Sequence, residues 1–146
     1  MLKLGSVHDY PEVFAAQKVE AILTDAEVDA LRRISGFRPR REWLLHRAVL
    51  KDLAVDYLGA RHQRYFPMNT LEITRLKGPL VEVHALMMPT EEPLLVGACS
   101  VTTEVAAALL IPPTDHLRLG VRVRRVERAY PFLVDHRFTR DEEAYL

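Results

Sequence analysis

The chain has 146 residues, of which 49% are hydrophobic and 27% charged, and this composition fits one globular domain spanning residues 1–146. Twenty Lys and Arg residues balance twenty Asp and Glu residues, so we expect no general affinity for nucleic acid. Cys99 is the only cysteine, which excludes an intrachain disulfide and a thiolate zinc site and favours a cytoplasmic setting. The longest apolar run, residues 105–113, is far shorter than the roughly 20 residues of a membrane-spanning helix, and no signal peptide is visible, so we expect no membrane partner.

The first half of the chain predicts helices. Residues 1–23 leave two alternatives open, a helix that starts near Asp9 and Pro11 or a strand that closes at residues 19–23. Thr24 and Glu27 have the spacing of a capping box, and the apolar residues that follow predict a helix over about 25–35.

A longer helix is predicted from residue 40 to residue 58. Pro39 suits the first turn of a helix, and no glycine or proline follows until Gly59, which we expect to end it. Apolar residues surround nearly the whole circumference of this segment. We therefore expect a central helix that is packed on more than one side.

The second half predicts strands. Short apolar or alternating runs at 71–74, 81–86, 94–101 and 105–111 are separated by prolines and polar residues. Residues 117–126 alternate strictly, as in a half-exposed strand, and Thr139 with Glu142 forms a capping box that opens a further helix. Helices followed by a meander of strands indicate the α+β class.

One face of the long helix carries cations. Arg40, Arg47 and Lys51 fall within about 40° of one another at helical spacing, while the acids of this segment lie on the far side. Such a basic stripe suits a phosphate-bearing ligand. A solvated face, or ion pairs with other segments, explains the same pattern equally well.

Other polar groups favour structural roles. The arginines near residues 118–125 fit an exposed strand face better than a binding site. The six histidines show no ligand pairing, so we expect no metal site. Ser100 and Cys99 lack the neighbours of a nucleophile and fit a packed strand, and no glycine-rich phosphate loop is present.

Three motifs resemble those of one enzyme family. The run RREWLLHRAVLKD at 40–52 closely resembles the arginine, tryptophan, glycine, arginine and lysine motif of surfactin-type 4'-phosphopantetheinyl transferases. The segment GACSVTTEVAAALL is similar to the family's SxSHSxxxxAxAA strand pair. LGVRVRRVER is similar to its GxDxExxxR strand and is followed by an FTxxE helix start at 138–142. The resemblance covers about residues 24–146 in the family's order.

The resemblance implies a fold and a ligand. Family enzymes are pseudo-dimers of two similar α+β lobes, and this chain would be one lobe plus the start of a second. They transfer the phosphopantetheine arm of coenzyme A to a carrier-protein serine with the help of magnesium. The resemblance would make Arg40, Arg47 and Lys51 contacts of coenzyme A.

The same resemblance implies that catalysis is lost. Arg122 and Arg124 stand where the family has its metal-binding aspartate and glutamate, and guanidinium groups cannot ligate magnesium. Val101 replaces the histidine for the pyrophosphate, and His46 replaces the glycine of the helical motif. The family's next helix, with a further acid and a lysine, lies beyond Leu146. We therefore expect no catalytic residue and no bound magnesium.

These observations favour a noncatalytic interaction module. It would serve a carrier-protein-dependent polyketide or fatty-acid synthase system, with a carrier protein or a synthase domain as partner. A single lobe is expected to keep apolar surface, including part of residues 94–101, and so to form a homo-oligomer or to bind a complementing half-transferase chain. The alternatives are active transfer with a site completed by a partner chain, and a binder that retains coenzyme A without turnover.

Overall fold

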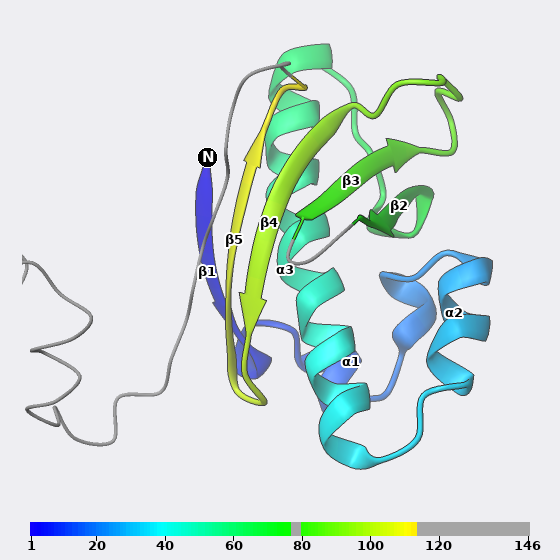
Figure 1. Cartoon of the computed structure of the whole chain (residues 1–146), viewed down its shortest axis with the longest axis vertical. Coiled ribbons are helices and arrows are strands. Elements are labelled where there is room, and N and C mark those ends of the chain that lie inside the picture. Colours follow the sequence, from blue (N-terminus) through cyan, green and yellow to red (C-terminus); the bar gives the residue numbers. More distant parts are fainter. Residues whose placement is uncertain (77–79, 114–146) are drawn as a thin grey trace, which may run out of the picture.

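The protein is an antiparallel five-stranded sheet with a long helix across one face, as the α+β prediction requires (Figure 1). The computed structural model describes residues 1–76 and 80–113. The predicted strand at 117–126, the basic cluster beside it and the helix start at Thr139 lie outside these residues. The sheet order is β1-β5-β4-β3-β2, with strands β1 (Leu2–Ser6), β2 (Leu71–Arg75), β3 (Leu80–Ala85), β4 (Leu95–Val101) and β5 (Val105–Ile111).

In the N-terminal segment a helix starts at Pro11, as one of the two alternatives predicted, but it ends at Phe14, and residues 19–21 form a 3-10 turn and not a strand. The segment forms the edge strand β1, a short helix α1 (Pro11–Phe14) and two 3-10 turns, η1 (Val7–Asp9) and η2 (Val19–Ala21). Strand β1 pairs with β5, a segment about a hundred residues later in the chain. Local sequence could not indicate this strand, because its hydrogen-bond partners come from that distant segment.

Strand β1 approaches the long helix closely at Gly5. A Cβ atom at this position would lie 2.6 Å from a methyl group of Val49, so only glycine permits the contact. Lys3 points to the same side and forms ion pairs with Asp52 at 2.7 Å and Asp56 at 3.3 Å. Because side chains alternate along a strand, Leu2 and Leu4 point away from the helix and are exposed.

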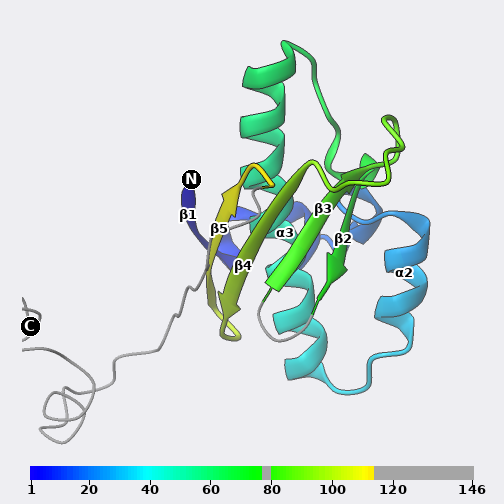
Figure 2. The same ribbon diagram turned by 45° about the horizontal axis from the view of Figure 1, so that its top comes forward.

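Helix α2 (Asp25–Arg32) starts with the predicted capping box. The Thr24 hydroxyl accepts a hydrogen bond from the Glu27 backbone N–H, and the Glu27 carboxylate accepts one from the Thr24 N–H. The helix ends three residues before the predicted boundary. Figure 2 shows α2 beside the N-terminal half of the long helix.

The central helix α3 (Phe37–His62) is longer than predicted at both ends. Its N-cap is Gly36, whose φ of 91° favours glycine. Gly59 does not end the helix, because Gln63 takes the left-handed conformation that closes it one turn later. Residues on several sides of α3 are fully buried, which confirms its central position; they include Leu45, Ala48, Val49, Leu50 and Ala54.

All four strands that were predicted between residues 71 and 111 are present. The expectation that part of 94–101 forms an exposed apolar surface is wrong for the residues that face the core. Leu95 is fully buried and Cys99 is buried, and both belong to the hydrophobic core. Gly97 lies on the same face of β4 and is buried as well. In the described part of the chain, no helix has the length and apolar character to cross a membrane.

Candidate functional site

Lys51 lies in the protein core, with no part of its side chain exposed. Its ammonium group donates a hydrogen bond to the Ile22 carbonyl at 2.7 Å and forms an ion pair with the Glu27 carboxylate. Burial lowers the pKa of Lys51, and the negative charge of Glu27 acts in the opposite direction. This cation of the predicted stripe is therefore bound by another segment of the same chain.

Glu27 connects three elements through its carboxylate. It caps the start of α2, pairs with Lys51 on α3, and accepts a hydrogen bond from the Ile73 N–H on β2 at 3.2 Å. The sequence indicated Glu27 only as a capping residue. Its pairing with Lys51 could not be predicted, because the two residues are brought together by the packing of α2 on α3.

Arg47 is the second residue of the stripe, and its side chain is also enclosed. The residue is 8% exposed, and its guanidinium lies 3.8 Å from the centroid of the Trp43 ring. One terminal nitrogen contacts Nδ1 of His46 at 3.3 Å, but the buried Nε has no hydrogen-bond partner among the described residues. A buried N–H group without an acceptor is unfavourable, so this atom marks a place where an anion would be stabilised.

The charges around Arg47 are predominantly positive. Burial lowers the pKa of Arg47 to about 10; the charge of Glu27 acts against this shift, and that of Arg75 adds to it. Lys51 is close enough for the charge of Arg47 to affect its pKa too. Arg47, Lys51 and Arg75 thus place three positive charges near one another, with Glu27 as their principal counter-ion. This excess of positive charge favours a bound anion.

His46 and Cys99 lie near Arg47 and are both uncharged at neutral pH. Burial, followed by the charges of Arg47 and Arg75, lowers the pKa of His46 to about 3, so its Nδ1 accepts the contact from Arg47. Burial raises the pKa of the Cys99 thiol to about 12, which leaves no thiolate for nucleophilic chemistry at neutral pH. Both groups fit a packing role.

Arg40, the third residue of the stripe, is bound elsewhere. Its Nη1 donates to the carbonyls of Leu31 and Ile34 at 2.9 and 3.2 Å, at the end of α2. The structure therefore brings Arg47 and Lys51 together around Glu27 but gives Arg40 different partners. The coenzyme A contacts that the resemblance implies for the three residues stay predictions.

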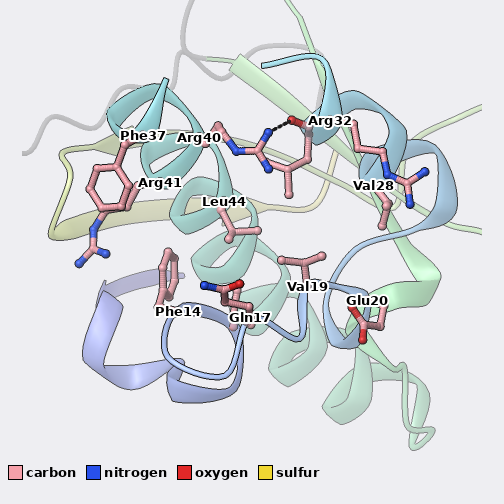
Figure 3. Close-up of a pocket in the computed structure, with 12 residues that line it drawn as sticks. Phe14, Gln17, Val19, Glu20, Val28, Arg32, Phe37, Arg40, Arg41 and Leu44 are labelled. Carbon is pink, nitrogen blue, oxygen red and sulfur yellow. Dashed lines mark hydrogen bonds between the residues drawn. The ribbon is translucent and has the colours of Figure 1, made fainter. Parts of the chain in front are cut away.

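Arg40 borders a cavity of about 480 Å³ between α1, α2 and the start of α3 (Figure 3). Arg32 and Arg41 border it as well, and neither was singled out in the sequence. Arg41 follows Arg40 in the motif run at 40–52, so the sequence could have indicated it. No sequence pattern pointed to Arg32. The cavity has seven apolar residues in its wall: Val13, Phe14, Val19, Val28, Leu31, Phe37 and Leu44.

Metal ligands and known relatives add no further assignment. Within residues 1–76 and 80–113, no three His, Cys, Asp or Glu side chains gather as a metal site would require. Arg122 and Arg124, which the resemblance would place at the positions of magnesium ligands, lie outside those ranges. No protein-family model and no curated protein matches the chain.

Proposed function

We propose that the chain is a 4'-phosphopantetheinyl-transferase-like domain that no longer transfers, and that it acts as an interaction module of a carrier-protein-dependent polyketide or fatty-acid synthase system. The motif run at 40–52 supports the proposal, because it lies on the central helix and is followed by antiparallel strands in the expected order. The observed α+β architecture is compatible with one lobe of such an enzyme.

The observation that carries the proposal is the burial of Lys51. To bind a nucleotide phosphate, its ammonium group would have to leave Ile22 and Glu27. The Glu27 carboxylate would then stay buried without its counter-ion, which costs about 3–5 kcal/mol. A lysine held in this way stabilises the fold, and this supports the loss of transfer chemistry that the substitutions at residues 101, 122 and 124 suggest.

A transfer assay tests the noncatalytic part of the proposal. The chain is incubated with coenzyme A, magnesium and an apo carrier protein, and the intact carrier is weighed by mass spectrometry. We expect the carrier mass to stay unchanged, because Arg122 and Arg124 would repel the metal and Val101 cannot bind the pyrophosphate. The double variant Arg122→Asp, Arg124→Glu should also be inactive, since Val101 would remain.

A carrier that gains the mass of phosphopantetheine would contradict the proposal. If the gain requires a second polypeptide from the synthase system, the alternative of a site completed by a partner chain would hold instead. A gain that is lost in Arg47→Gln would assign the activity to this chain and not to a contaminating transferase.

A second function, retention of coenzyme A without turnover, is favoured by the buried Nε of Arg47, which has no hydrogen-bond partner in the part of the chain that the structure describes. A phosphate oxygen would supply the acceptor that this buried group lacks, and Trp43 already lies against the guanidinium. Titration calorimetry at low salt should detect weak binding of coenzyme A that decreases as salt is added. Arg47→Gln should abolish it, whereas the exposed control Arg38→Gln should not; equal affinity in wild type and Arg47→Gln would reject this function.

A further inference from the structure

The cavity between α1, α2 and the first turns of α3 has the size and lining of a small-molecule site. Its volume of about 480 Å³ lies within the range of roughly 300–1,000 Å³ that is typical of ligand pockets. Most of its wall is apolar, with aromatic rings from Phe14 and Phe37. Figure 3 shows these rings on one side of the cavity and Val19 and Val28 on the other.

The charged groups around this cavity are unevenly distributed. Arg32, Arg40 and Arg41 border it, against the single acid Glu20. Figure 3 shows the three guanidinium groups spread around the cavity, with Glu20 at another part of its edge. An anion in the cavity would be attracted by these guanidinium groups, of which Arg32 pairs with Asp29 at 3.2 Å and Arg41 with Glu104 at 3.4 Å. Among the described residues, Arg40 has backbone carbonyls and no carboxylate as its partners, so its positive charge is the one left for a ligand.

The positions of two arginines are fixed by the fold. The Nε of Arg41 donates to the Thr103 carbonyl at 2.8 Å, and its guanidinium lies 5.5 Å from the Phe14 ring and 5.6 Å from the Phe37 ring. Arg40 makes both of its hydrogen bonds within the described residues through Nη1. The Nε and Nη2 donors of Arg40 remain for a ligand, and little side-chain entropy is lost when they bind one.

Gln17 adds a polar group to the apolar part of the wall. Its φ of 57° lies in the left-handed region, which residues other than glycine seldom adopt. Such conformations are often found at binding sites, where the surrounding structure imposes them. The amide can both donate and accept hydrogen bonds.

From these features we infer that the cavity binds a small ligand with an apolar body and one anionic head group, either a carboxylate or a phosphate. The apolar wall would bury the body, and Arg32, Arg40 and Arg41 would attract the head group. This goes beyond the proposed function, because it depends neither on carrier-protein binding nor on Arg47 and Lys51.

Four probes test the inference by titration calorimetry: octanoate, octyl phosphate, octanol and inorganic phosphate. Octanoate or octyl phosphate should bind, and whichever binds more tightly identifies the preferred head group. Octanol should bind more weakly because it lacks the charge, and inorganic phosphate should bind more weakly because it lacks the apolar body. Added salt should weaken the binding of the charged amphiphiles.

Arg32→Gln and Arg38→Gln form a matched pair of variants. The two arginine side chains are 74% and 76% exposed, and each has one ion pair within its own helix, but only Arg32 borders the cavity. Arg32→Gln should weaken octanoate binding about two- to fivefold, and Arg38→Gln should leave it unchanged. Neither substitution removes a buried contact, so both variants should fold.

A filling variant, Val28→Phe, provides a second measurement. The larger side chain on α2 would occupy part of the cavity and should weaken both charged amphiphiles, with circular dichroism as the check on folding. The inference is overturned if no charged amphiphile binds, if octanol binds as tightly as the tighter of octanoate and octyl phosphate, or if Arg38→Gln has the same effect as Arg32→Gln. Arg47→Gln should leave octanoate binding unchanged, so a failure here is distinguishable from a failure of coenzyme A binding.

Discussion

At the scale of single residues, the buried pair of Lys51 and Glu27 joins α3 to the start of α2. We expect Lys51→Met to lower the free energy of unfolding by about 3–5 kcal/mol, because it leaves the Glu27 carboxylate buried without a counter-ion. Urea denaturation measures the change. Arg38→Gln, which breaks an exposed pair with Glu42, should cost less than about 1 kcal/mol. Equal effects of the two substitutions would contradict a structural role of Lys51.

The buried imidazole of His46 makes stability depend on pH. Its pKa is about 3 in the folded chain, against 6.5 as its ordinary value, so the unfolded state binds a proton first as the pH falls. The contribution of neutral His46 to the free energy of unfolding is therefore fully present above pH 6.5. It is lost progressively as the pH falls from 6.5 toward 3. In His46→Gln, the free energy of unfolding should fall less steeply in this interval, by up to about 1.4 kcal/mol per pH unit.

The exposed Lys18 provides the control for this pH measurement. Urea denaturation of wild type, His46→Gln and Lys18→Gln is repeated at several pH values between 3 and 7. The slope should change for His46→Gln and stay as in the wild type for Lys18→Gln. Identical slopes in all three proteins would show that folding does not lower the pKa of His46.

At the scale of elements, two glycines are expected to respond in opposite directions to alanine. A Cβ at Gly97 would lie 2.1 Å from the Leu109 carbonyl oxygen, so Gly97→Ala must push β4 away from β5 and should destabilise the protein by about 1–3 kcal/mol. A Cβ at Gly59 meets the Arg64 carbonyl at an ordinary 3.5 Å. Gly59→Ala should stabilise α3 by about 0.5–1 kcal/mol.

Thermal denaturation of the two glycine variants checks this prediction. The midpoint should fall for Gly97→Ala and rise for Gly59→Ala. A rise for Gly97→Ala would mean that β4 and β5 are not packed as described.

Elements whose signals are local could be predicted from the sequence. The capping box of Thr24 and Glu27, the long run without glycine or proline before Gly59, and the alternating strands each carry their own pattern. Strand β1 could not be predicted because it depends on β5. The spacing of Arg40, Arg47 and Lys51 identified a common helix face. The partners of these residues could not be predicted, because they depend on how α2 packs on α3.

At the scale of the whole molecule, the edge strand β1 is a candidate surface for the predicted self-association. Leu2 and Leu4 of the edge strand β1 are 63% and 72% exposed on the side away from α3. Exposed apolar side chains on a sheet edge favour association with another chain. If the chain forms a homo-oligomer through this edge, Leu4→Glu should shift it toward monomer.

Light scattering over a dilution series measures this shift, and circular dichroism verifies that the variant folds. Lys18→Glu, an exposed change outside the sheet, serves as the control for altered charge. A wild type that is monomeric at every concentration would remove self-association from the account and leave a different polypeptide as the partner.

The central claim is that the domain binds the carrier-protein system without modifying it. Native mass spectrometry of the chain mixed with apo carrier protein, coenzyme A and magnesium tests both parts in one spectrum. The account predicts a complex of the chain with the carrier, and a carrier mass that remains that of the apo form. A carrier that has gained phosphopantetheine, or the absence of any complex when synthase domains are also supplied, would contradict it.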